Sequence, residues 1–346
     1  MLKFFELFNR GYIDFSCSHS FSGPFNRNVK ISSTPEFENS SWNADKVGGL
    51  LINFGRSTQI FSGIGKTFIN LKKLIITGSL IKFIKRSDFT DLSELKELRL
   101  SYVEIPFIPE DTLFDLPALE KFKISGSTLQ RLPGNLFLFS SNLIEFDLDS
   151  NYELTKIPDE LFKNIQNLKK LTIRKSSRLK IVKKSSWNFP ELEEFQIKFS
   201  NIENVPENLI MSSKKLKRLN LSNNKIKTLE RNFKSNFAQL GDLMLDGNPL
   251  NELTQDAFDE FLFLKKLSLR DCNLKSLPEN IFDSLTELEE LDLGNNELTA
   301  LTENIFAKNL KLKKIELDGN KFKKIEFDFT KLQEIESISL RGKDCI

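Results

Sequence analysis

The chain has 346 residues, and its 50 Lys and Arg side chains nearly balance its 48 Asp and Glu side chains, leaving a net charge of +2. This balance creates no overall field that favours nucleic acid or an acidic membrane surface, and no stretch is apolar over the length of a membrane-spanning helix. The chain contains one histidine, His19, and neither a glycine-rich phosphate loop nor a CxxC pair. We therefore expect no catalytic residues, no cofactor and no bound metal.

Residues 1–46 do not repeat and predict an N-terminal cap. Residues 12–17 alternate between apolar and polar side chains, as a strand does, and residues 28–32 have the same character after a turn-rich stretch. We expect these two segments to form a short antiparallel element, with Trp42 packed against it. Such a cap would cover the apolar end of the repeats that follow.

From Val47 onwards, a pattern of apolar residues recurs every 24 residues. It is clearest in residues 216–263, where two copies of LxxLxLxxNxLxxL follow one another in register. Twelve whole repeats fill residues 47–334, the repeat that starts at Leu143 has 25 residues, and residues 335–346 begin a repeat that is cut short. This periodicity predicts one solenoid rather than two globular domains, because each repeat packs only on its neighbours.

Positions in a repeat are counted from the first leucine of this pattern, which is Leu216 in one copy and Leu240 in the next. The apolar residues at positions 4 and 6 predict a strand with one buried face. Positions 3, 5 and 7 are mostly polar or charged. The sheet must therefore be open on its other face, unlike most parallel sheets. We expect the strands to form a parallel ladder with a spacing of about 4.8 Å, whose open face is concave.

Two further positions are expected to hold the turns together. Position 9 should place a buried amide against backbone groups that the ladder leaves unpaired. Its residues are Asn151, Asn224, Asn248, Asn296 and Asn320, with Cys272 in one repeat. A position at the back of each coil should form a stacked aromatic spine. Its residues are Phe89, Phe137, Phe162, Phe258, Phe282 and Phe306, with Trp187 in one repeat.

The pattern LxxLxLxxNxLxxLPxxxF resembles the leucine-rich repeat, and the resemblance covers residues 47–346. It implies an α/β solenoid, the leucine-rich-repeat horseshoe, with a concave parallel β-sheet and an irregular or 3₁₀ convex side. The 24-residue length, with Pro and Phe on the convex side, is similar to the extracellular type found in Toll-like ectodomains, connectin and chaoptin. The resemblance also implies a non-enzymatic module that binds a protein ligand or receptor, in recognition, adhesion or receptor signalling.

The cysteines and glycosylation sequons bear on the cellular compartment. Cys17 and Cys345 lie at opposite ends of a solenoid of roughly 55 Å, whereas a disulfide needs Cα atoms within about 7 Å, so they cannot pair within one molecule. The resemblance implies paired cysteines in both caps of an extracellular protein, and Cys345 stands where a C-terminal cap would begin. Asn39 and Asn220 each begin a glycosylation triplet.

We expect a secreted or cell-surface protein, with cap partners beyond the given ends, although polar residues interrupt the apolar start of the chain and no signal peptide is evident. The alternative is an intracellular scaffold or adaptor of the same architecture, with reduced cysteines.

The candidate binding surface is the part of the concave face where the charge changes sign between neighbouring strands. Its residues are Glu145, Asp147, Asp149, Lys170, Thr172, Arg174, Gln196, Lys198 and Arg218. Complementary charge steers a protein partner and fixes partner choice. The alternative is that opposite charges on adjacent strands only pair with each other. The basic residues 169–184 make a sulfated glycan a further candidate partner, whereas the acidic strip has no loop geometry for calcium.

Overall fold

The computed structural model describes residues 3–5, 12–16, 47–53, 58–60, 63–78, 80–181, 185–205, 212–229, 237 and 239–341. Several of the sequence predictions lie outside these residues: the strand at 28–32, and the roles of Cys17, Asn39, Trp42 and Cys345. The chain divides into two compact units. Unit 1 comprises residues 1–168 and 172–179, and unit 2 comprises residues 169–171 and 180–346.

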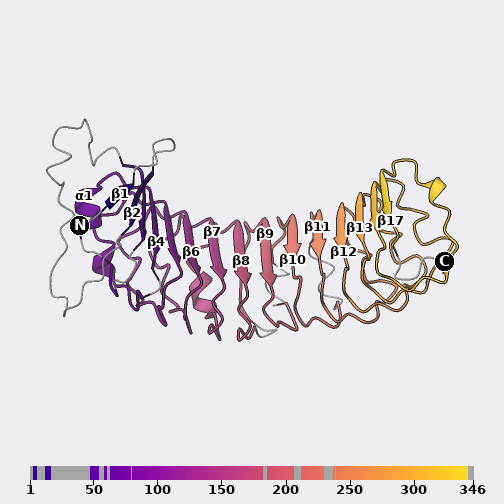
Figure 1. The fold of residues 1–346 in the computed structure, drawn as a ribbon, viewed down its shortest axis with the longest axis horizontal. Helices are drawn as coiled ribbons and strands as arrows, with labels where there is room; N and C mark the ends of the chain where they lie inside the picture. Colours follow the sequence, from indigo (N-terminus) through magenta and orange to yellow (C-terminus); the bar gives the residue numbers. More distant parts are fainter. Residues whose placement is uncertain are drawn as a thin grey trace. The chain divides into compact units, whose positions relative to one another are not determined.

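Unit 1 is a ladder of parallel strands in which each repeat contributes one strand (Figure 1). The strands are β3 (Gly49–Asn53), β4 (Lys73–Thr77), β5 (Glu97–Ser101), β6 (Lys121–Ser125) and β7 (Glu145–Asp149). Leu98 of β5 lies opposite Phe122 of β6, which lies opposite Phe146 of β7. These partners are one repeat apart, which confirms the predicted period and the predicted parallel ladder.

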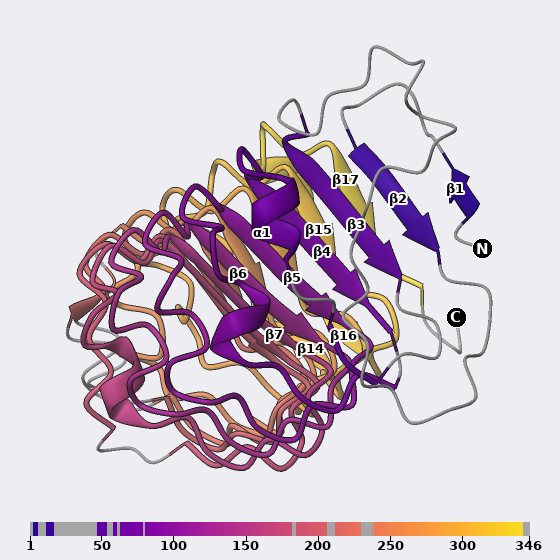
Figure 2. The ribbon, with the colours of Figure 1, turned by 90° about the vertical axis from the view of Figure 1, so that its left-hand side faces the viewer.

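The first strands extend this ladder towards the N-terminus. Strand β2 (Tyr12–Ser16) confirms the strand predicted at residues 12–17, and it pairs in parallel with β3 (Figure 2). Strand β1 (Lys3–Phe5) pairs with β2 in the antiparallel direction. The antiparallel pair predicted here joined residues 12–17 to residues 28–32, and that pairing is wrong, because β1 and β3 occupy the two edges of β2.

Unit 2 is a second parallel ladder, and strand β8 (Lys170–Arg174) contributes residues to both units. The main strands of unit 2 are β9 (Glu194–Lys198), β10 (Arg218–Asn220), β11 (Asp242–Met244), β12 (Lys266–Ser268), β13 (Glu290–Asp292), β15 (Lys314–Glu316) and β17 (Ser337–Ser339). Two short strands, β14 (Ala300–Leu301) and β16 (Lys324–Ile325), form a separate parallel pair.

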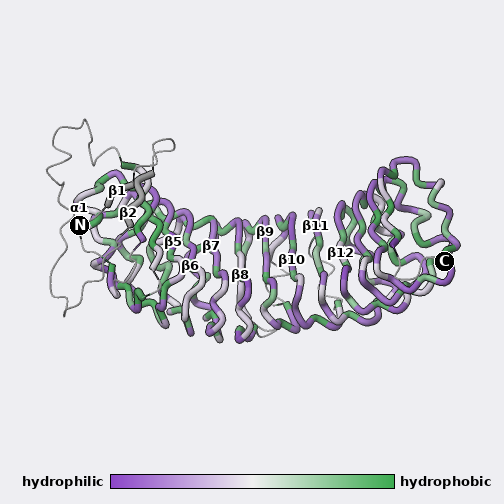
Figure 3. Tube along the Cα trace, in the orientation of Figure 1, coloured by the Kyte–Doolittle hydropathy of each residue, from purple (hydrophilic) through white to green (hydrophobic). Residues whose placement is uncertain are grey.

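The core of each unit lies behind its strands. Leu98 and Leu100 of β5 are fully buried, as are Leu219 and Leu221 at the same positions of a repeat in unit 2. Hydrophilic residues alternate with them along the coils (Figure 3). Burying one such leucine side chain stabilises the fold by about 1.5–3 kcal/mol. The apolar residues that alternate with polar ones in the sequence, and that predicted a half-buried sheet, are therefore the residues that form the core.

The predicted stacked aromatic spine is confirmed in unit 2, at the back of the coils. In unit 2, the Phe282 ring stacks between Phe258 and Phe306, with ring centroids 6.1 and 5.9 Å apart and interplanar angles of 19° and 18°. In unit 1, the Phe137 ring contacts Phe122 and Phe146 edge-on, at 5.8 and 5.0 Å. The spine of unit 1 therefore interlocks with aromatic residues from the strands, which the sequence pattern did not predict.

Short helical turns form part of the back of the coils, as the resemblance implied. They are the 3₁₀ turns Arg86–Asp88, Asp159–Phe162 and Phe329–Lys331 and the one-turn helix α1 (Ile64–Thr67). Among the described residues, no helix is long and apolar enough to cross a bilayer.

Position 9 holds the turns together through buried side-chain hydrogen bonds. The Asn248 Nδ2 donates to the carbonyls of Leu221 and Leu245, at 3.0 and 2.8 Å, and its Oδ1 accepts from the backbone N–H of Ile226 at 3.0 Å. The same network recurs at Asn224, Asn296 and Asn320. The sequence pattern did not indicate the members of this row that are serines, which are Ser127, Ser176 and Ser200.

Cys272 replaces the asparagine in one repeat and is fully buried. Burial raises the pKa of its thiol to about 12. We expect iodoacetamide at pH 8 to leave Cys272 unmodified in the folded protein, because the thiolate is the reactive species, and to modify it fully in denaturant. Peptide mass mapping of native and denatured samples checks this expectation. Modification of Cys272 in the native sample at the rate seen in denaturant would contradict a structural role for the thiol.

From β5 to β13, and again at β15, the chain leaves the strand through a left-handed residue at position 8. The residues are Tyr102, Gly126, Ser150, Lys175, Phe199, Asn223, Gly247, Asp271, Asn295 and Gly319, with φ between 50° and 74°. Gly, Asn and Asp adopt this conformation readily, whereas other residues pay about 1–2 kcal/mol for it. Tyr102, Lys175 and Phe199 are therefore exceptions that the turn itself does not favour.

Candidate binding surface

The candidate binding surface is the open face of the strands, formed by positions 3, 5 and 7 and called the strand face. Position 3 alternates in charge from strand to strand. The row is Lys73, Glu97, Lys121 and Glu145 in unit 1 and Lys170, Glu194, Arg218, Asp242, Lys266, Glu290 and Lys314 in unit 2. This regularity was not predicted, although comparing one position along all the repeats would have revealed it.

Neighbours in this row form ion pairs. In unit 1, Lys73 lies 3.2 Å from Glu97 and Lys121 lies 3.3 Å from Glu145. In unit 2, Lys266 lies 2.6 Å from Glu290. The row therefore neutralises itself, and its side chains stabilise adjacent strands as cross-strand pairs do.

In unit 1, the predicted acidic strip is paired in the same way. The Lys123 Nζ lies 3.0 Å from an Asp147 carboxylate oxygen, and an Arg174 guanidinium nitrogen lies 3.0 Å from Asp149 and 4.0 Å from Asp147. The Asp147 Oδ1 and the Arg174 Nε are nevertheless buried and accept or donate no hydrogen bond within the described part of the chain. The two side chains thus retain hydrogen-bonding capacity beyond the pairs that they form.

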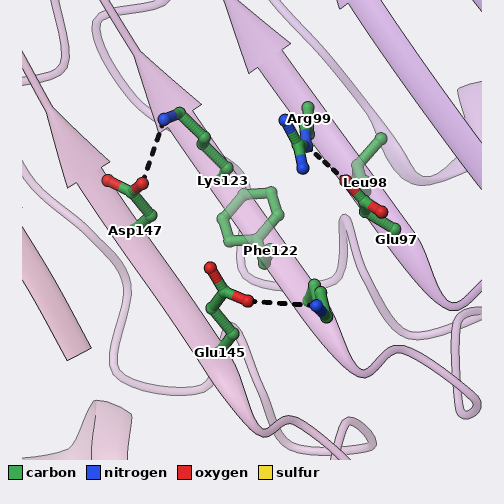
Figure 4. A pocket seen from close by; sticks show the side chains of 8 residues that line it. Glu97, Leu98, Arg99, Phe122, Lys123, Glu145 and Asp147 are labelled. Carbon is green, nitrogen blue, oxygen red and sulfur yellow. Dashed lines mark hydrogen bonds and ion pairs between the residues drawn. The ribbon is translucent and has the colours of Figure 1, made fainter. Parts of the chain in front are cut away.

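A shallow depression of about 90 Å³ lies on the strand face of unit 1 (Figure 4). Its rim alternates between cations and carboxylates: Glu97, Arg99, Lys121, Lys123, Glu145 and Asp147. This volume is well below the roughly 300 Å³ of a typical small-molecule site. The depression is suited to a side chain of a macromolecule rather than to a metabolite.

In unit 2, the candidate residues converge on Glu194. Its carboxylate lies 3.0 Å from Lys170 and 2.9 Å from Arg218, and it also accepts a hydrogen bond from Gln196. Burial opposes ionisation of Glu194, but the hydrogen bonds from Arg218 and Lys170 outweigh it and lower the pKa of the carboxyl group. Lys198 is half-buried and has no ion-pair partner among the described residues.

Two predicted residues are less available than the sequence indicated. Thr172 is only 4% exposed, so it presents almost no surface to a partner. Asn220, the glycosylation candidate, is half-buried on the strand face, and its Oδ1 accepts a hydrogen bond from the backbone N–H of Ser222 at 3.0 Å. Among the described residues, no group of three His, Cys, Asp or Glu side chains is placed to hold a metal ion.

Comparison with known sequences identifies the architecture. The model of the leucine rich repeat family matches residues 69–129, 190–250 and 263–322, which is more than half of the chain. The chain belongs to the leucine-rich repeat family. No curated protein sequence matches this leucine-rich repeat chain.

Solved leucine-rich repeat structures share the fold. Drosophila Toll, in its complex with Spatzle, has a TM-score of 0.70 and 19% identity over 95% of this chain and 49% of the Toll chain. Mouse RP105, in its complex with MD-1, has a TM-score of 0.70 and 22% identity over 85% of this chain and 51% of the other. A leucine-rich repeat protein of Leptospira interrogans has a TM-score of 0.64 and 21% identity over 86% and 78% of the two chains. This chain therefore spans about half the length of the Toll and RP105 chains.

Proposed function

We propose that this leucine-rich repeat protein is an extracellular recognition, adhesion or receptor-type module without catalytic activity. Its strand face binds a protein partner. The observation that carries the proposal is the open strand face itself, which in each unit presents polar and charged side chains from a ladder of parallel strands. The structures of Toll with Spatzle and of RP105 with MD-1 support the proposal, because both are complexes of leucine-rich repeat proteins with other proteins.

A protein partner fits the charge arrangement better than a polyanion. Most charges on the strand face already have a neighbour of opposite sign, as at Glu194 and Asp147, so the face has both signs in close alternation. A partner with a complementary mixture of charges can replace these pairs one by one, which gives selectivity more than affinity. A uniformly charged polymer would meet repulsion at every second residue.

Reversing two cations of strand β8 is expected to weaken partner binding at least tenfold. The Lys170→Glu, Arg174→Glu double variant removes the pairs with Glu194 and Asp149 and leaves like charges facing each other. Like charges on adjacent strands are destabilising, so we also expect a modest fall in the melting temperature, and binding is compared at a temperature at which both proteins are folded. Surface plasmon resonance with the partner, alongside a thermal melt, measures both effects.

A matched control reverses two cations of unit 2 that lie off the strand face. Lys311→Glu with Lys321→Glu also removes two ion pairs, those with Glu287 and Glu297 at 2.7 and 3.0 Å. This control should retain full affinity. Equal affinity of the β8 variant and the wild type would remove the strand face of β8 from the binding surface.

The extracellular part of the proposal is tested on the endogenous protein. We would recover it from cells and from medium and measure its intact mass before and after deglycosylation and reduction. Recovery from the medium, with sugar on Asn39 or Asn220, is the expected result. A cytosolic protein of 39.9 kDa with three free thiols would contradict it and establish an intracellular scaffold or adaptor instead.

A further inference from the structure

Beyond the strands of unit 1, the backbone ladder continues for one residue at position 8. The Tyr102 N–H donates to the carbonyl of Ser125 at 2.8 Å, and the Gly126 N–H donates to the carbonyl of Asp149 at 2.9 Å. This row leads along the side of unit 1, from coil to coil, at about the 4.8 Å spacing of parallel strands.

A second row lies five residues further along the coil, or six in the coil that carries the insertion. Phe107, Arg131 and Lys156 are joined from coil to coil by parallel β-bridges, so their side chains also follow one another along unit 1. Four residues of each turn separate the two rows, or five in the coil that carries the insertion. The two rows together define one lateral surface of unit 1.

Tyr102 is an unusual residue on this surface. It has a φ of 54° and is 72% exposed, although Gly, Asn or Asp would adopt this conformation at less cost. One face of its ring rests on Gly126, where an added Cβ atom would lie 3.0 Å from the ring carbon Cδ1. A strained residue that the core does not need is a candidate for binding.

Tyr152 is placed on the same surface by the inserted residue of the 25-residue repeat. The preceding Asn151 is fully buried and donates to the carbonyl of Ile124 at 3.1 Å, while Tyr152 itself is 51% exposed. Phe107, in the second row, is 52% exposed. Exposed tyrosines and phenylalanines of this kind are typical of the centres of protein interfaces, because they bury a large rigid area at low entropic cost.

The cations of this surface differ from those of the strand face. Arg131, Lys156 and Lys175 are exposed, and none has an ion-pair partner in the described part of the chain. Of the carboxylates on the same turns, Glu153 is paired with Arg178, and Glu104 is exposed without an ion-pair partner among the described residues, so three such cations stand against one such carboxylate. A partner that brings carboxylates here would gain ion pairs without breaking any that the protein already has.

We propose that this lateral surface of unit 1 binds an acidic protein segment that also carries aromatic or aliphatic side chains. The surface comprises Tyr102, Phe107, Arg131, Tyr152, Lys156 and Lys175. The aromatic rings receive the apolar side chains, and the cations around them receive the carboxylates. This surface is separate from the strand face, so the two proposals stand or fall independently.

The test uses an array of synthetic dodecapeptides at 0.15 M salt, in which acidic and aromatic content vary independently. The wild-type protein is expected to bind acidic peptides with aromatic residues at least tenfold more strongly than it binds acidic peptides without aromatic residues. The same tenfold difference is expected relative to basic peptides with aromatic residues. Two double variants, Tyr102→Asn with Tyr152→Ser and Arg131→Ala with Lys156→Ala, should each reduce this binding at least tenfold. Tyr102→Asn should leave the melting temperature unchanged or raise it, because asparagine suits a positive φ.

The matched control is Leu138→Ala with Lys163→Ala, which removes an exposed apolar residue and an exposed cation elsewhere in unit 1. It should bind the array as the wild type does. Equal binding by the wild type and both double variants would overturn the proposal, as would the absence of any preference between peptide classes. The proposal would also be overturned if acidic peptides bound equally well with and without aromatic residues and a heparin oligosaccharide displaced them. That result would indicate a polyanion site instead.

Discussion

Replacing Phe282 with alanine is expected to lower the free energy of unfolding of unit 2 by about 3–5 kcal/mol. The ring is fully buried and stacked on both sides, by Phe258 and Phe306, and each of these comes from an adjacent repeat. The substitution leaves a cavity that the neighbouring rings cannot fill without breaking their own stacking. Because each repeat is stabilised by its neighbours, the loss should reach beyond the mutated coil. Urea denaturation followed by circular dichroism measures the change.

Phe263→Ala is the matched control for this prediction. Phe263 lies in the adjacent repeat and is 60% exposed, so its truncation should change the free energy of unfolding by no more than about 0.5 kcal/mol. Similar free energies of unfolding for the Phe282→Ala and Phe263→Ala variants would show that the stacked Phe282 ring does not contribute to stability.

The second large effect is expected from Asn248→Ala, which should cost about 3 kcal/mol. The substitution leaves the buried N–H of Ile226 without its acceptor and the carbonyls of Leu221 and Leu245 without the Asn248 donor. Each buried polar group left unpaired costs about 1–3 kcal/mol. Hydrogen exchange offers a local reading as well, because the amide of Ile226 should exchange faster in the variant than in the wild type.

An exposed asparagine of the same repeat provides the comparison. The Asn251 Nδ2 donates only to the carbonyl of Pro249, and its φ of 53° suits glycine. Asn251→Gly should therefore leave both the stability and the exchange of Ile226 within error of the wild type. If Asn248→Ala were equally harmless, position 9 would not be the element that ties one turn to the next.

The fold was predictable from sequence because its decisive contacts repeat. Leu219 lies opposite Leu243, the same position of the next repeat, Asn248 bonds the turn before its own, and Phe282 stacks on its own counterparts. One register therefore specifies strand, turn and spine together. Residues without such counterparts could not be predicted in this way. An example is the antiparallel pairing of β1 with β2, because β1 precedes the repeats.

The candidate surface was predictable only in outline. The change of sign between Asp149 and Arg174 is visible in the sequence, but their ion pair and the convergence of Lys170 and Arg218 on Glu194 depend on where long side chains point. The row of serines at position 9 escaped prediction because a hydroxyl can satisfy the same turn from a shorter side chain, as when the Ser200 Oγ donates to the carbonyl of Lys198 at 2.9 Å.

The most direct test of the binding role is a lysine-labelling footprint of the complex with the partner recovered from the native source. Acetylation of each lysine is measured by mass spectrometry in the free protein and in the complex. Binding on the strand face predicts strong protection of Lys123, Lys170 and Lys198 and unchanged labelling of Lys163 and Lys311. Protection of Lys163 and Lys311, with the three strand-face lysines still fully reactive, would contradict the account and place the partner elsewhere on the coils.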